Sequence, residues 1–164
     1  MTFSYHAAVF VHVLSAVVWL GGMFALALLA PILRGVGDDA ARQGLFHRLG
    51  RRFRLLGWIC LAALGASGLV QLHVKGWWGM PFWSAPGLWG SPLGHALAGK
   101  LLTVGIMLVV QALHDFWLGP LAGRVPAGTE QARLLRKRAA LLARFNAVAA
   151  LALLWFAVAV ARSG

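Results

Sequence analysis

Six histidines are the side chains of this sequence with the most obvious chemistry, because imidazole is a good ligand for copper, zinc and haem iron. His12 falls well inside a long apolar segment, where an unpaired polar ring is costly, and His6 precedes it by about 9 Å of helix rise. His73 and His95 flank a stretch rich in tryptophan and proline. Two interpretations follow. These histidines either ligate a metal ion or lie at the membrane interface without binding one.

Other side chains recur at helical spacing along the apolar segments. His12 begins a face of the first segment, and Lys100 begins a stripe along the third. Ser67 on the second segment is followed one turn later by a glutamine. Side chains of this kind within a membrane span are expensive and usually face the interior of a bundle. The further intramembrane candidates are Trp19, Gln71, Met107, Gln111, His114 and Asn146.

The elements that would carry these residues are membrane-spanning helices. Of 164 residues, 60% are hydrophobic and 12% are charged, whereas a soluble domain has about 45 to 50% apolar and about 25% charged residues. This composition excludes a soluble globular protein, and a single cysteine excludes a disulfide-rich one. Four apolar segments, at about 7–33, 55–74, 97–119 and 143–161, are long enough to cross the bilayer. We expect an all-α integral membrane protein, a four-transmembrane-helix bundle forming one domain over 1–164.

Positive charge indicates how the spans are oriented. Between the first two spans lie Arg34, Arg42, Arg48, Arg51, Arg52 and Arg54, and between the last two lie Arg124, Arg133, Arg136, Lys137, Arg138 and Arg144. The positive-inside rule places both groups in the cytoplasm and both termini in the periplasm of a bacterial inner membrane. The same rule accounts for the basic charge of the chain, so nucleic-acid binding is not needed to explain it. Binding of anionic lipid headgroups is a second role expected for these arginines. A short amphipathic helix on the membrane surface is expected within 37–53.

This orientation brings His6, His12, His73 and His95 toward the periplasmic side and favours a metal centre there. The alternative makes His6 an interfacial residue, His73 a snorkelling side chain and His95 part of a loop. Lys100 is expected at the depth of His12 and either faces the site or snorkels outward. We expect no carboxylate within a span able to act as a general acid or base. The sequence also has no Gly-rich phosphate loop and no cysteine pair, so hydrolases and nucleotide-driven pumps are not expected.

Several stretches of the chain resemble the copper-resistance D (CopD) family. They read HVLSAVVWLGGMFALALLAPILR at 12–34, RRFRLLGW at 51–58, ASGL at 66–69, ALHDFWLGP at 112–120 and RFN at 144–146. The resemblance covers nearly the whole chain in order, and includes the region of Lys100. It implies a bacterial inner-membrane protein concerned with copper transport or tolerance, although longer family members have more than four spans. The partners that follow are the bilayer, a periplasmic copper-binding protein and further copies of the chain.

A more distant resemblance is to the HemJ type of protoporphyrinogen oxidase, a four-span protein with b-type haem. His12 and Lys100 fall where that family has a functional histidine and lysine. The first span here lacks that family's Arg-Leu pair and second histidine, which argues against oxidase activity. The first prediction is therefore copper handling at a periplasmic-side histidine site. The alternative is a membrane redox protein in which His12 ligates haem b and Lys100 binds a propionate or moves a proton.

Overall fold

A computed structural model describes residues 3–35, 37–126 and 129–163, which form helices and short connections without a strand. The element order is α1 (Phe3–Arg34), α2 (Asp39–Val74), α3 (Met80–Trp83), η1 (Leu88–Gly90), α4 (Pro92–Ala112), η2 (Leu113–Leu118), α5 (Gly119–Arg124) and α6 (Glu130–Ser163). Helices long and apolar enough to cross a membrane cover Phe3–Leu33, Gly44–Val74, Pro92–Ala122 and Glu130–Ser163. The four-span, all-α fold class is therefore confirmed.

The second span is longer than its apolar run suggested. The sequence predicted a separate surface helix within 37–53 and a span beginning near residue 55, but α2 runs without interruption from Asp39 to Val74. Proline is absent from this stretch, so no residue interrupts the backbone hydrogen bonds of the helix. Arg34 ends α1, and the other arginines expected in this loop lie on the first part of the long helix α2.

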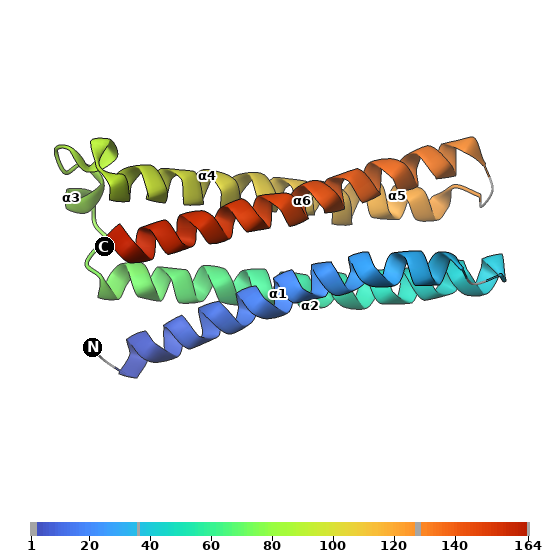
Figure 1. Cartoon of the computed structure of the whole chain (residues 1–164), viewed down its shortest axis with the longest axis horizontal. Helices are drawn as coiled ribbons and strands as arrows, with labels where there is room; N and C mark the ends of the chain where they lie inside the picture. The colour runs from blue at the N-terminus through green and yellow to red at the C-terminus, as the bar shows by residue number, and fades with distance from the viewer. Residues whose placement is uncertain (1–2, 36, 127–128, 164) are drawn as a thin grey trace. The chain divides into compact units, whose positions relative to one another are not determined.

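The chain divides into two compact units, each described here by itself. In the first, Met1–Ser84, α1 and α2 form a helical hairpin (Figure 1). Gly22 allows close approach of the helices, because a Cβ at this position would collide with the ring of Phe53. The indole of Trp19 also lies beside Gly57, where an added Cβ would make only ordinary contact with it. Small residues at a helix contact are typical of membrane proteins, where packing replaces the hydrophobic effect.

In the second unit, Ala85–Gly164, α4 and α6 form the corresponding hairpin (Figure 1). Gly99 lies against the ring of Phe156, which a Cβ would displace. Ser91 caps α4, since its hydroxyl accepts a hydrogen bond from the Gly94 amide at 3.0 Å. The six residues of η2 form a π-helix between α4 and α5 and contact α6. The two units thus repeat one plan, a pair of long helices closed by a glycine against a phenylalanine ring.

Candidate functional site

His12 is joined to the neighbouring helix by a hydrogen bond. Its Nδ1 lies 3.0 Å from Oγ of Ser67, which is 5% exposed. The Ser67 hydroxyl donates to the carbonyl of Ala63 at 2.6 Å. A hydroxyl has a single proton, so Ser67 accepts from His12 Nδ1–H. With Nδ1 as the donor, the ring nitrogen that keeps a lone pair is Nε2.

The other three histidines predicted for the metal centre lie on more open positions. His6 and His73 are exposed at the end of the first hairpin where α1 begins and α2 ends, and His95 is exposed on the first turns of α4 in the second unit. His73 packs edge-on against Trp78. No group of three or more histidine, cysteine, aspartate or glutamate side chains able to hold a metal occurs among the described residues. The four-histidine site stays a prediction.

The remaining candidates, two in each unit, differ in their burial and in their hydrogen bonds. Trp19 is 4% exposed, and within residues 3–35, 37–126 and 129–163 its Nε1 finds no hydrogen-bond acceptor. Gln71 donates to the Ser67 carbonyl of its own helix at 3.4 Å. In the second unit, Met107 is 2% exposed in the core, and Lys100 is half-buried on α4.

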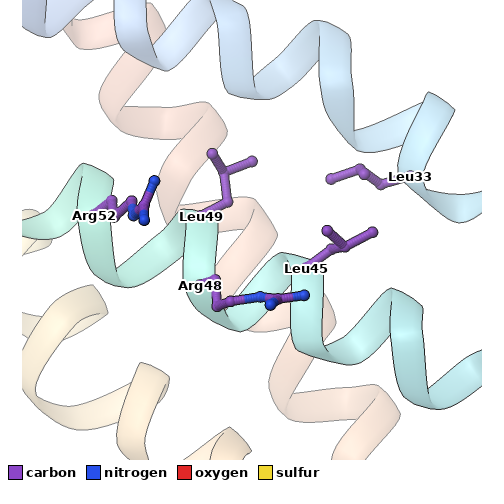
Figure 2. Close-up of a pocket in the computed structure, with 5 residues that line it drawn as sticks. All are labelled: Leu33, Leu45, Arg48, Leu49 and Arg52. Atoms are coloured by element: carbon purple, nitrogen blue, oxygen red, sulfur yellow. The ribbon is translucent and has the colours of Figure 1, made fainter.

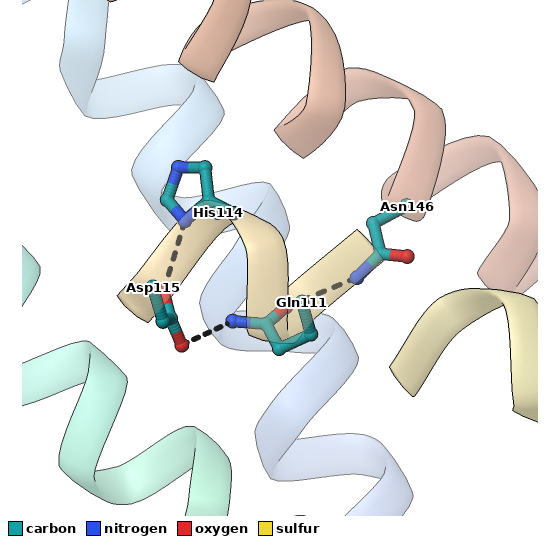
Figure 3. A network of polar contacts seen from close by, with 4 residues as sticks. All are labelled: Gln111, His114, Asp115 and Asn146. Atoms are coloured by element: carbon teal, nitrogen blue, oxygen red, sulfur yellow. Dashed lines mark hydrogen bonds and ion pairs between the residues drawn. The ribbon is translucent and has the colours of Figure 1, made fainter. Parts of the chain in front are cut away.

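A connected polar network occupies the interior of the second unit (Figure 3). Asn146 of α6 donates through Nδ2 to Gln111 Oε1 at 3.0 Å, and Gln111 donates through Nε2 to Asp115 Oδ2 at 2.7 Å. His114 Nδ1 lies 2.9 Å from Asp115 Oδ1. Asp115 is 6% exposed and Asn146 is 2% exposed. The network therefore ties α4, η2 and α6 together through buried polar groups.

Asp115 corrects the expectation that no span contains a usable carboxylate. It lies within the span Pro92–Ala122 and is buried. A regular α-helical count favoured His114 for the inward stripe, but residues 113–118 adopt a π-helix, whose wider turn changes the direction of the side chains that follow. The spacing of Gln111 and Asp115, four residues apart, was the available clue.

A second feature of the first unit is a basic pocket of about 430 Å³ between the end of α1 and the first part of α2 (Figure 2). Leucines from both helices and two arginines one turn apart line it, namely Leu33, Leu45, Arg48, Leu49 and Arg52. Guanidinium groups beside apolar side chains suit the phosphate and the upper acyl chain of an anionic lipid.

Comparison with known proteins identifies the family. The profile described as copper resistance protein D matches residues 47–161. An uncharacterized protein of Aquifex aeolicus (strain VF5) is 30% identical over 122 residues, which cover 73% of each chain. No solved structure matches this chain. The family match spans most of α2, all of α4 and the polar network, and nearly all of α6, and the chain belongs to the copper resistance protein D (CopD) family.

Proposed function

We propose that this membrane protein handles copper ions and that His12 contacts the ion through Nε2. The observation that carries the proposal is the hydrogen bond from His12 Nδ1–H to Ser67. Histidines that ligate metals commonly donate their other ring nitrogen to a neighbouring acceptor, which orients the ring and raises its basicity. The copper resistance family supplies the identity of the metal.

Ser67 and Gly68, both on α2, lie next to the His12 ring. Ser67 is held by its own hydrogen bond to Ala63, and a Cβ added at Gly68 would make ordinary contact with His12 Cε1. The His12 ring therefore lies beside Gly68, and its Nδ1 is hydrogen-bonded to Ser67. His6 and His73 lie toward the same end of this hairpin, each about 9 Å of helix rise beyond His12 or Ser67. We propose these two, with His95, as sites through which copper reaches His12.

Copper binding by His12→Ala tests the proposal. The purified full-length protein is titrated with Cu(I) and with Cu(II) in separate competition experiments against a chelator. We expect His12→Ala to weaken binding at least about 100-fold, because the ligand itself is lost. His47→Ala is the matched control, since His47 is exposed on the early part of α2 and should bind as the wild type does. Equal binding by His12→Ala and the wild type would contradict the proposal, and a Soret band in the visible spectrum would point to haem instead.

Ser67 is proposed as a positioning residue. Ser67→Ala removes the acceptor for His12 Nδ1–H and should weaken copper binding about tenfold. Ser67→Thr keeps the hydroxyl and should restore most of that loss. A role in packing alone would give the opposite order, because alanine is smaller and threonine adds a methyl group to a buried site.

We propose further that the protein lies in a bacterial inner membrane with both termini in the periplasm. The asymmetry of lysine and arginine supports this orientation. A periplasmic phosphatase fused after residue 164 should be active, and one fused after residue 42 should be inactive. The reverse pattern would move His12 to the cytoplasmic side.

A further inference from the structure

The first part of α2 carries three arginines on one face of the helix. Arg48, Arg51 and Arg52 are spaced three and four residues apart along the helix, and all three are exposed. Like charges at this spacing repel one another. The acidic residues of this unit are Asp39, which begins α2 about 13 Å of helix rise before Arg48, and Asp38, which precedes it. An anion from outside the hairpin would therefore stabilise this face.

Two hollows adjoin along this face. The basic pocket of about 430 Å³ includes Arg48 and Arg52 in its lining (Figure 2). A second hollow of about 350 Å³ is lined by the same two arginines together with Arg51 and Leu55. Of the described residues that line the two hollows, none is acidic. The hollows therefore share Arg48 and Arg52, whereas Arg51 lines the second hollow alone.

Leucines give both hollows an apolar side. In the basic pocket, Leu45 and Leu49 of α2 face Leu33 of α1 (Figure 2). In the second hollow, Leu55 begins the apolar run of α2 and is 66% exposed. A free anion such as phosphate gains nothing from leucine side chains, whereas the acyl chains of a lipid do. The lining therefore favours a lipid over a soluble anion.

The level of the arginines along α2 suits the headgroups of a bilayer. Because α2 is one uninterrupted helix, its rise measures the depth of each residue. Arg52 precedes Leu55 by about 4.5 Å of rise, and Arg48 precedes it by about 10 Å. The polar layer outside the hydrocarbon core is roughly 5 to 8 Å deep on each side. Guanidinium groups at these positions reach the level of lipid phosphates.

We propose that this face binds one phospholipid that carries two phosphate groups, the chemical class of cardiolipin, with one phosphate in each hollow. Guanidinium groups bind phosphate oxygens in pairs, and basic pockets of membrane helices bind headgroups of this class. Arg48 and Arg52 lie between the two phosphates, and Arg51 contacts the one in the second hollow. Since the phosphates belong to one molecule, binding of the first raises the effective concentration of the second. The proposal is independent of copper, because His12 and Ser67 take no part in it.

Lipid binding to the purified full-length protein in detergent tests the proposal. Native mass spectrometry counts the lipids bound during titrations with cardiolipin and with phosphatidylglycerol, compared at equal phosphate concentration. We expect the wild type to bind one cardiolipin at least about tenfold more tightly, because two linked phosphates occupy both hollows at once. Pyrophosphate, which has no acyl chain, should not displace it. Equal binding of the two lipids by the wild type, or displacement by pyrophosphate, would overturn the proposal.

Arg51→Gln separates the two hollows. It should weaken binding of cardiolipin about fivefold and leave phosphatidylglycerol within about twofold of the wild type, because Arg51 lines the second hollow alone and a single phosphate needs one hollow. Arg48→Gln should weaken both lipids, because Arg48 lines both hollows. Lys137→Gln with Arg138→Gln, on exposed positions of α6, should bind both lipids as the wild type does. Equal weakening of the two lipids by Arg51→Gln would contradict the proposal.

Discussion

The two hairpins of this protein share a packing device and differ in what they bury. Gly22 against Phe53 closes the first, and Gly99 against Phe156 closes the second. Between its helices the first has the bond of His12 to Ser67, whereas the second has a bridge from Asn146 to Gln111 that continues to a carboxylate.

This difference shows that helix association does not require the second network. Close packing at glycine already brings each pair of helices together, and a hydrogen bond between membrane helices adds little, about 0.6 kcal/mol on average. The second network differs in that it includes a buried acidic side chain, Asp115, which Gln111 and His114 both contact.

The largest effect is expected from loss of the carboxylate. Asp115→Leu leaves the Gln111 amide and the His114 ring without their acceptor and should lower the free energy of unfolding by about 3 kcal/mol. Unfolding in detergent micelles, followed by tryptophan fluorescence, measures the change. Asp115→Asn keeps the shape and should cost less. Equal stability of Asp115→Leu and the wild type would show that the polar network does not stabilise the second hairpin.

The glycine contacts should respond alike in the two hairpins. Gly22→Ala and Gly99→Ala each push a Cβ into a phenylalanine ring and should destabilise by about 2 kcal/mol. Gly65→Ala on α2 and Gly105→Ala on α4 are matched controls, because a Cβ there meets no atom within 4 Å. They should be neutral or stabilising by up to about 1 kcal/mol, since alanine favours the helix. A loss confined to one hairpin would show that only that pair depends on close approach.

The basic pocket should distinguish the first unit in its response to lipid. Arg48→Gln and Arg52→Gln should each weaken binding of an anionic phospholipid about fivefold, because each removes one positive charge near the headgroup. Binding to nanodiscs with and without anionic lipid gives the comparison. Lys137→Gln with Arg138→Gln is the control, since both residues are exposed on α6 outside the pocket. Equal losses from the control pair would indicate a general effect of charge.

The smallest effect concerns the bond between the helices of the first hairpin. Ser67→Ala should lower the free energy of unfolding by about 0.6 kcal/mol. Thr103→Val removes a hydroxyl that donates to Gly99 within its own helix and should cost less than that. Thermal unfolding of the two variants side by side measures the difference. A loss of several kcal/mol for Ser67→Ala would show that the His12–Ser67 bond contributes as much to the free energy of unfolding as the network of the second hairpin does.

Sequence patterns anticipated most of the residues in these contacts but few of their partners. His12, Gln111, His114 and Asn146 were each expected to matter because polar groups in apolar segments are costly. Asp115 was underestimated, since it lies near the end of its apolar run and beside a histidine that fits the inward stripe better. It is buried within the π-helix at 113–118, and its spacing of four residues from Gln111 was the signal in the sequence that could have indicated an inward position.

The amino-acid sequence alone determined the four spans, the all-helical class and the charge asymmetry. The length and polarity of a segment are local properties, and they decide whether it inserts into a bilayer and in which orientation. Tertiary structure decided that α2 continues through the basic region, that Ser67 receives His12, and that Asp115 turns inward to Gln111. Each of these depends on which faces of two helices meet, and that is set by packing between residues as far apart as Gln111 and Asn146.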